Sequence, residues 1–515
     1  MTAFSPQDLL QALPRFRETT FVVQAPDGSV GLQFQSPSQD LTLLGVLPPL
    51  YPEWLGNRSF TETHGLRFPY VGGAMANGIT SPAMVISLAR AGMLSFLGTA
   101  GLSLPKMREY LVATSQELSA QGLPFGANLI HSPQEPHLEM NTVELFFEHG
   151  IRRVSASAFM KLSPAIIRFA ARGLRRLEDG TIHREHYVFA KISRPEVAAH
   201  FLRPPPEKAL RALVEAGHLT AQEAELAATL PVAEDLIVES DSGGHTDNRP
   251  LSALFPTIAK LRDDIVTHYG YPQVPRLGAA GGIGTPEALA AAFALGADFV
   301  LTGSINQASV EAAQSDSAKD LLASAGLADV IMAPAGDMFE MGVEVQVLRR
   351  GTLFASRARR LHQVYSRYES IEAIPTEERA RLEKEIFQAD MNQIWSDTRQ
   401  FFEHTDPREV TRAESNPHHK LALVCRWYLG LSSKWSIQGT PERAMDYQIW
   451  MGPAQGAFNQ WVQGSFLEDR RNRTVVQMAL NLLEGGAQIT RAQQLRTFGT
   501  PVPPEAFHFV PRRLQ

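Results

Sequence analysis

Short apolar runs alternate with stretches of helical character between about residues 65 and 305. Several runs are rich in Val, Ile and Phe, which is typical of strands buried on both faces of a parallel sheet. Because strands alternate with helices over this length, we expect an α/β fold of the (β/α)8 TIM barrel type, and an open doubly wound sheet stays the alternative. The predicted strands are Pro69–Gly73, Met93–Leu97, Phe125–Ile130, Ile151–Ser155, Tyr187–Ile192, Asp235–Glu239, Val274–Ala279 and Asp298–Thr302.

Helix-start signals follow three of these strands. Ser81-Pro82, Ser163-Pro164 and Thr285-Pro286 each place a capping hydroxyl before a proline at the first helical position. Gly92 and Gly296 are expected to end the first and third of these helices in the left-handed conformation.

The segments around the barrel follow other patterns. Residues 1–60 are mixed and partly Pro-rich, which predicts a short N-terminal segment with a few short strands. We place the barrel at residues 61–355 and a mostly α-helical C-terminal domain at residues 356–515. An inserted helical hairpin is expected at about residues 195–234, where Thr220 and Glu223 form a capping box.

The most informative segment is Leu277–Gly284, which ends the seventh predicted strand. Gly281 and Gly282 let the backbone approach a ligand, and the helix after them offers unpaired N–H groups to an anion. The eighth strand ends at a second small turn, Gly303-Ser304, and barrels commonly hold a phosphate at these two loops. A Rossmann dinucleotide site is the alternative, but its acidic residue belongs at the end of the next strand, where Asp298 does not lie.

Other candidate residues also follow strands. His245 closes the segment after the sixth strand and is a candidate proton donor, although a histidine there can also merely cap a turn. The small residues at Gly72–Gly78 would let the backbone lie against a flat ring, and the alternative is a tight turn between strand and helix. Asn128 ends an apolar strand, where a buried amide usually has a specific hydrogen-bond partner. Lys191 ends the fifth strand, where its charge would favour a bound anionic or reduced ring system; the alternative is a lysine that is simply solvated.

Composition narrows the class of protein. The chain of 515 residues is long enough for more than one domain, and its net charge of −6 gives no support for nucleic-acid binding. The single cysteine, Cys425, excludes an internal disulfide and suits a reducing compartment. No secretory signal and no apolar run of ~18 residues is present. We therefore expect a cytoplasmic protein that binds no membrane.

Two further clusters have weaker implications. His183, Glu185 and His186, like the pair His418 and His419, lack metal-ligand spacing, so we expect exposed loops and no metal site. Basic residues concentrate in one stretch, which is either a solvated helix face or a patch for an acidic partner. The stretch contains Arg349, Arg350, Arg357, Arg359 and Arg360.

These motifs resemble the 2-nitropropane dioxygenase/nitronate monooxygenase superfamily of FMN barrels. The elements that carry the resemblance are Ser242–His245, Ala280–Ile283 and Gly303-Ser304. Residues 239–249, 337–355 and 446–468 are similar to a narrower group, the PfaD-type trans-acting enoyl reductases of polyketide and polyunsaturated fatty acid synthases.

The resemblance implies an FMN enzyme that uses NADPH to reduce an α,β-unsaturated thioester on an acyl carrier protein. A homodimer is compatible with the resemblance. It implies His245 as the catalytic acid or hydrogen-bond donor. The implied cofactor-binding residues are Gly73, Ala74, Met75, Asn128, Lys191, Gly243, Gly244, Ala280, Gly281, Gly282, Gly303 and Ser304.

Two other functions stay open. A nitronate monooxygenase would use the same flavin without NADPH, and a flavin-free scaffold would dock carrier proteins through its helical domain. An IMP dehydrogenase-like enzyme needs a nucleophilic cysteine in a barrel loop, and Cys425 lies outside the predicted barrel.

Overall fold

The computed structural model describes residues 2–133 and 135–515. The chain packs as two compact units. Unit 1 contains Met1–Asp241, Asp247–Ala313 and Ala457–Gln515, and unit 2 contains Ser242–Thr246 and Gln314–Gly456. These units are defined by packing within the folded chain. The separate C-terminal domain at residues 356–515 stays a prediction.

Unit 1 is built on a closed barrel of eight parallel strands, which confirms the predicted fold. Each predicted strand overlaps an observed one. In barrel order from the first strand, they are β5 (Tyr70–Gly72), β6 (Leu94–Leu97), β7 (Gly126–Ile130), β8 (Arg153–Ser157), β11 (Tyr187–Ile192), β12 (Asp235–Glu239), β13 (Arg276–Ala280) and β14 (Phe299–Thr302).

Aromatic side chains pack together inside the barrel. The helix α2 (Arg58–His64) contributes Phe60, whose ring stacks on Phe299 with centroids 4.2 Å apart. Phe96 and Phe189 complete this buried group, with centroids 5.0 Å apart. The barrel interior is therefore a packed core at this level rather than a channel.

The predicted helix caps are present. Ser81, Ser163 and Thr285 each accept a hydrogen bond from the backbone three residues on, and the helices they start are α3 (Pro82–Arg90), α6 (Pro164–Ala171) and α11 (Pro286–Ala294). Gly92 and Gly296 have φ of +79° and +96°, in agreement with the predicted helix ends. The other barrel helices are α4 (Leu104–Leu118), α5 (Pro136–Glu148) and α10 (Leu251–Tyr269).

The long crossover contains three helices rather than the two predicted. The first, α7 (Pro195–Leu202), contacts β11 and α10 as an ordinary barrel helix does. The inserted hairpin consists of α8 (Glu207–Glu215) and α9 (Ala221–Ala227), which both contact α6. Thr220 and Glu223 form the predicted capping box of α9.

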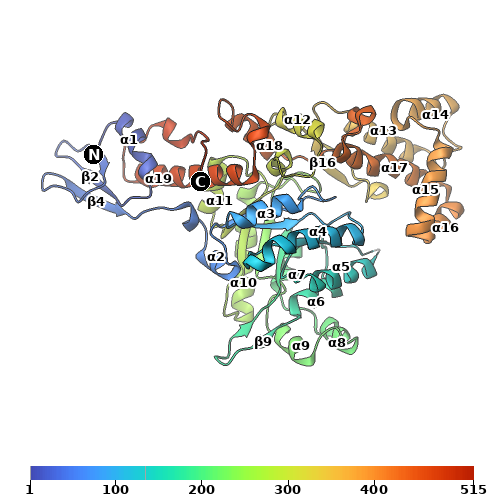
Figure 1. Ribbon diagram of the computed structural model, residues 1–515, viewed down its shortest axis with the longest axis horizontal. Coiled ribbons are helices and arrows are strands. Elements are labelled where there is room, and N and C mark those ends of the chain that lie inside the picture. Colours follow the sequence, from blue (N-terminus) through green and yellow to red (C-terminus); the bar gives the residue numbers. More distant parts are fainter. Residues whose placement is uncertain (1, 134) are drawn as a thin grey trace. The chain divides into compact units, whose positions relative to one another are not determined.

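Chain ends complete unit 1. The N-terminal strands β1 (Thr2–Ala3), β2 (Thr20–Gln24), β3 (Val30–Gln33) and β4 (Thr42–Leu47) form an antiparallel sheet, with α1 (Pro6–Ala12) after the first. The long helix α19 (Val475–Thr497) lies against α11, and Figure 1 shows it beside α1. Gly485 and Gly486 permit this approach, because a Cβ there would lie 2.7 Å from Pro286 and 2.4 Å from Leu289.

Unit 2 combines a hairpin with helices. The antiparallel pair β15 (Val330–Pro334) and β16 (Glu344–Leu348) packs against α13 (Phe354–Arg367). The remaining helices are α12 (Asp316–Ala323), α14 (Thr376–Leu382), α15 (Met391–Thr405), α16 (Pro407–Ser415) and α17 (Pro417–Gln438), and α18 (Pro453–Trp461) contains the last boundary between the units.

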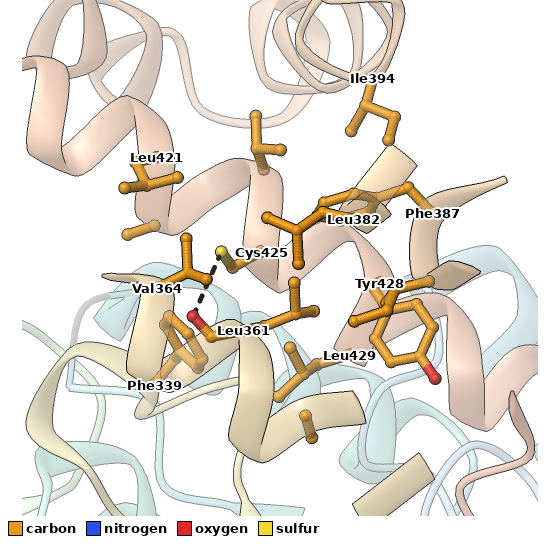
Figure 2. Packing of buried hydrophobic residues seen from close by; sticks show 14 of the residues in the cluster. Phe339, Leu361, Val364, Leu382, Phe387, Ile394, Leu421, Cys425, Tyr428 and Leu429 are labelled. Atoms are coloured by element: carbon orange, nitrogen blue, oxygen red, sulfur yellow. Dashed lines mark hydrogen bonds between the residues drawn. The ribbon is translucent and has the colours of Figure 1, made fainter. Parts of the chain in front are cut away.

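Cys425 lies in the hydrophobic core of unit 2, on α17. Figure 2 shows its sulfur directed toward the Leu361 carbonyl of α13, among side chains that include Val364 and Leu421. Burial raises the pKa of the Cys425 thiol, which disfavours the reactive thiolate. Within residues 2–133 and 135–515, no helix has the length and apolar character required to cross a membrane.

Candidate active site

The C-terminal ends of the barrel strands carry most of the predicted cofactor residues. After β5, the Gly73 N–H donates to the Thr302 carbonyl of β14 at 2.9 Å. A Cβ at Gly73 would lie 2.8 Å from the Leu301 side chain, so this close approach requires glycine. The first strand therefore ends beside the strand that leads into Gly303 and Ser304.

Thr80 holds the backbone of the next predicted residues. Its hydroxyl donates to the Gly73 carbonyl at 3.0 Å and accepts from the Met75 N–H at 2.8 Å. Gly98, after β6, leaves no room for a side chain, since its Cβ would lie 1.8 Å from the Met75 carbonyl. The path of Ala74 and Met75 is thus fixed by the packing of two strand ends.

The glycine turn after β13 combines one crowded and one open position. Gly281 and Gly282 have φ of +83° and +70°, which side-chain-bearing residues rarely adopt. A Cβ at Gly281 would lie 2.5 Å from Ser240 Oγ, whereas no atom lies within 4 Å of the Cβ position of Gly282. Ala280 is buried, and its carbonyl accepts from both the N–H and the hydroxyl of Ser240 at 2.9 Å.

The turn after β14 is open as well. Gly303 has no atom within 4 Å of its Cβ position, and Ser304 begins the 3-10 helix η4 (Ser304–Ala308). Asn306 fixes this turn, because its amide donates to the Thr302 carbonyl at 3.0 Å. Two adjacent barrel loops therefore present glycine backbone with space beside it, together with the N-terminus of α11, an arrangement that suits an anion.

Asn128 lies on β7 and is almost fully buried, as its sequence setting predicted. Its amide donates to the Ser155 carbonyl at 2.8 Å and to Ser157 Oγ at 2.9 Å, both on β8. Its backbone carbonyl accepts from the Thr99 hydroxyl. These bonds hold the Asn128 side chain in one orientation.

Lys191 forms an ion pair that the sequence did not indicate. Its ammonium lies 3.0 Å from Glu239 Oε1, and each side chain is 21% exposed. Lys191 is near the C-terminal end of β11, and Glu239 is the last residue of β12. The pair places one positive and one negative charge on neighbouring strand ends at the same end of the barrel as Gly73 and Gly281.

A buried charge cluster occupies the opposite, N-terminal end of the barrel. Asp235 accepts from Arg276 Nε at 2.6 Å and lies 3.0 Å from His64 Nε2. Arg153 Nε donates to the other ring nitrogen of His64 at 3.2 Å. Each charged group named here has a partner, and the cluster joins α2 to the strands β8, β12 and β13.

Burial and neighbouring charges together shift the pKa values of this cluster. Burial lowers the pKa of His64 below its ordinary value and that of Arg153 to about 10. Burial also opposes the charge of Asp235, but His64 and Arg276 beside it hold its pKa well below the usual range. The network is structural, because it lies away from the end at which barrels place their catalytic groups.

His245 belongs to unit 2, with the rest of the loop Ser242–Thr246 that follows β12. Within this loop, Gly244 forms an antiparallel bridge with Gln346 of β16, through N–H···O distances of 2.9 Å and 2.8 Å. The Gln346 side chain also donates to the Ser242 carbonyl at 2.8 Å. Gly243 is required by crowding, since its Cβ would lie 2.9 Å from the Met451 nitrogen.

Asp337, which sequence reasoning did not single out, lies next to the candidate acid His245. His245 Nε2 lies 3.4 Å from Asp337 Oδ1, and the two side chains are 45% and 61% exposed. Burial acts to raise the pKa of Asp337, but the hydrogen bond and charge of His245 bring it below its ordinary value. The only sequence signal was the position of Asp337 at the start of a segment similar to PfaD-type enzymes.

The histidine clusters are less exposed than the sequence suggested. His186 is buried and its Nδ1 lies 2.8 Å from the Arg172 carbonyl, and His419 is buried at the start of α17, 2.8 Å from Glu409. The expectation of exposed loops was wrong for both, because these rings pack against neighbouring helix ends. In the described part of the chain, no group of three or more His, Cys, Asp or Glu side chains is arranged to hold a metal ion.

The sequence model described as "Nitronate monooxygenase" matches residues 57–374, more than half of the chain. The protein belongs to this family. A second model, the inserted helical domain of [acyl-carrier-protein] S-malonyltransferase, matches residues 368–447.

Among solved structures, the enoyl reductase domain of MlnA, from the macrolactin biosynthesis cluster of Bacillus amyloliquefaciens, is similar over most of both chains. The identity is 38%, the TM-score is 0.83, and the match covers 86% of this chain and 99% of that domain. Our chain is therefore homologous to an enoyl reductase domain.

Curated relatives are longer proteins. Polyketide biosynthesis protein PksE of Bacillus subtilis is 45% identical over 84% of this chain and 56% of its own length. A component of the polyunsaturated fatty acid synthase of a Thraustochytrium strain is 43% identical over 86% of this chain and 30% of its own length. The chain thus spans about a third to about half of these relatives, and the matches agree with the predicted resemblance.

Proposed function

We propose that this protein is an FMN-dependent enoyl reductase that uses NADPH to reduce α,β-unsaturated thioesters carried by an acyl carrier protein. It acts as a separate protein that supplies this reaction to a polyketide or polyunsaturated fatty acid synthase. The observation that carries the proposal is the match to the MlnA enoyl reductase domain over 99% of that domain.

The second family match supports the carrier protein as partner. Residues 368–447 match a domain of an enzyme whose description names the acyl carrier protein. The curated relatives are named for polyketide biosynthesis or polyunsaturated fatty acid synthesis, in which intermediates are held as carrier-bound thioesters.

The strand ends of unit 1 fit an FMN phosphate. The Cβ positions of Gly282 and Gly303 are open, so a ligand has space beside the backbone of these two turns. The helix α11 adds its positive N-terminal end beside the same loop. Gly73, Ala74, Met75 and Asn128 would border the ring.

Charge at these strand ends also suits a flavin. When bound, FMN would supply the hydride chemistry between NADPH and the β-carbon of the thioester. The Lys191 ammonium stabilises negative charge that develops nearby, and Glu239 holds that ammonium in position.

His245 is the proposed acid. Hydride addition at the β-carbon moves an electron pair to the thioester oxygen, and the resulting enolate needs a hydrogen-bond donor and then a proton at the α-carbon. Asp337 holds Nε2 of His245 and thereby orients the ring. The other ring nitrogen is then available to the substrate.

Nitronate oxidation is the second candidate, because the family description itself names it. Such an enzyme would use the same flavin site with a nitronate and oxygen and would not need NADPH. The coverage of an enoyl reductase domain at 38% identity favours the reductase.

Anaerobic stopped-flow absorbance separates the two functions. The purified protein is mixed with NADPH and then with crotonyl-pantetheine. We expect NADPH to bleach the flavin absorbance and the thioester to restore it. Absorbance that ignores NADPH but is bleached by an alkyl nitronate would overturn the proposal.

The role of His245 is tested in the same instrument. His245→Ala should keep its flavin and its bleaching by NADPH but lose restoration by the thioester roughly a hundredfold. His508→Ala is the matched control, since His508 is also exposed and lies far along the chain. Normal restoration in His245→Ala would remove His245 from the mechanism.

A further inference from the structure

Residues 345–368 contain six arginines and no aspartate or glutamate. Arg357 is not available to a partner, because it is paired with the buried carboxylate of Asp446. The remaining five are exposed and form what we call the arginine surface: Arg349, Arg350, Arg359, Arg360 and Arg367.

Carboxylates only partly neutralise this surface. Arg349 and Arg350 share Asp329, at the long distances of 3.5 Å and 3.7 Å, and their side chains are 57% and 59% exposed. Arg360 is paired with Glu378 and is 50% exposed. Members of this set of five exposed arginines are thus paired with two carboxylates, those of Asp329 and Glu378. The arginine surface is therefore positive, although the chain has a net charge of −6.

The two faces of α13 explain why these arginines stay exposed. Leu361 and Val364 point into the core of unit 2 (Figure 2), and the exposed positions of the helix include Arg360 and Arg367, seven residues apart. Seven residues are about two turns, so these two arginines lie on one face. Arg350 is exposed in the turn that precedes the N-terminus of the same helix.

The arginine surface is also close to His245 within unit 2. On the inner side of α13, the His362 ring packs against Phe339 with centroids 5.2 Å apart. Phe339 is two residues from Asp337, the partner of His245. A series of contacts therefore leads from α13, through Phe339 and Asp337, to His245.

We propose that the arginine surface of α13 is the docking site for the acyl carrier protein. This inference rests on the proposed function and adds where the carrier binds. Carrier proteins are acidic and present their thioester on a long flexible phosphopantetheine arm. Positive charge would attract the carrier, and the arm would span α13 to bring the thioester to His245.

The test compares a carrier-bound substrate with a free one. The variant Arg350→Gln/Arg360→Gln/Arg367→Gln is assayed with crotonyl-loaded acyl carrier protein and with crotonyl-pantetheine. We expect KM for the loaded carrier to rise roughly tenfold at low salt, with kcat and the crotonyl-pantetheine kinetics unchanged. Added salt should raise the wild-type KM for the carrier and change that of the variant less.

The matched control removes three exposed, paired arginines of unit 1. In Arg90→Gln/Arg108→Gln/Arg211→Gln, the side chains are 49%, 53% and 67% exposed on α3, α4 and α8. We expect this control to keep the wild-type KM for the carrier. Equal effects of the two variants, or a rise in KM for NADPH instead of the carrier, would overturn the docking site.

Direct binding keeps the two proposals separate. Fluorescence anisotropy of labelled holo-acyl carrier protein measures docking without turnover, and we expect roughly tenfold weaker binding to the arginine variant. A wild-type protein that binds the carrier but never reduces crotonyl-pantetheine would contradict the proposed function and leave docking supported. Equal binding by wild type and variant would overturn docking whatever the activity.

Discussion

The two ends of the barrel use polar groups in opposite ways. At the N-terminal end, Asp235, Arg276 and His64 are buried and pair with one another. At the C-terminal end, the Lys191–Glu239 pair is partly exposed, and Gly282 and Gly303 have space where a side chain would lie. One end uses its charges to hold the barrel together, and the other leaves its backbone open to a ligand.

This difference shows why perturbed ionisation alone is a poor guide to a catalytic site. The lowered pKa values of His64 and Asp235 belong to the structural end of the barrel. The candidate cofactor residues at the other end are instead marked by glycine geometry and by strand ends that meet. Backbone shape therefore indicates the candidate cofactor site, which the pKa shifts do not.

The largest contrast is expected in stability. Asp235→Ala would leave Arg276 without its buried partner, so the free energy of unfolding should fall by about 3–5 kcal/mol. Glu239→Ala, at the other end of the same strand β12, should cost less than Asp235→Ala, because the pair of Glu239 with Lys191 keeps partial contact with water. Urea unfolding followed by circular dichroism measures both, and equal losses would contradict the comparison.

The second test adds a side chain at the open end. Gly303→Val should not clash with the protein without flavin, because nothing lies within 4 Å of the Cβ position of Gly303. If the FMN phosphate uses this space, flavin affinity should fall roughly a hundredfold, or about 2.7 kcal/mol. Fluorimetric titration with FMN measures the change.

Gly430→Ala on α17 is the control for that substitution, since its Cβ position is equally open and lies in unit 2. It should not alter flavin affinity. Full affinity in Gly303→Val would show that the cofactor does not use the open end as proposed.

A smaller effect is expected at His245. Asp337→Asn removes the carboxylate that holds Nε2 of His245, so the ring should be positioned less well for proton transfer to the substrate. We expect a roughly tenfold loss of turnover at neutral pH. Flavin content and reduction by NADPH should not change, and Asp337→Glu should restore part of the activity. Turnover equal to that of the wild type would exclude the positioning role of Asp337.

The smallest effect is a pH dependence of stability. The pKa of His64 is lowered in the folded chain, so the unfolded chain takes up a proton first as the pH falls below about 6.5. Stability should then decrease by about 1.4 kcal/mol per pH unit and per such group until the folded pKa is passed. Urea unfolding between about pH 7.5 and 5.5 measures this slope.

His64→Gln should flatten that slope, and His186→Gln should flatten it further, because burial lowers the pKa of His186 as well. Unchanged slopes in both variants would show that these buried histidines do not control the acid sensitivity.

Local signals predicted the barrel because they depend on neighbouring residues. The run Tyr187–Ile192 is recognisable from its buried apolar residues, and Ser81-Pro82 from its helix cap. The pair Lys191–Glu239 and the buried Asp235 cluster join strands that are distant in sequence, so no local pattern reports them.

The candidate site was only partly predictable for the same reason. The glycine turns at Gly281 and Gly303 are visible as motifs. Asp337 meets His245 only because Gly244 pairs with β16, a contact across about a hundred residues. The packing of α19 on α11 at Gly485 is likewise tertiary, and a helical sequence pattern alone does not reveal it.

The most direct measurement of the central claim is a single-turnover product analysis. The flavin-loaded protein is reduced with one equivalent of NADPH without oxygen, mixed with crotonyl-pantetheine and examined by mass spectrometry. We predict one equivalent of butyryl-pantetheine per flavin for the wild type and little for His245→Ala. A reduced protein that leaves crotonyl-pantetheine unchanged, while the oxidised protein consumes a nitronate in the presence of oxygen, would contradict the account.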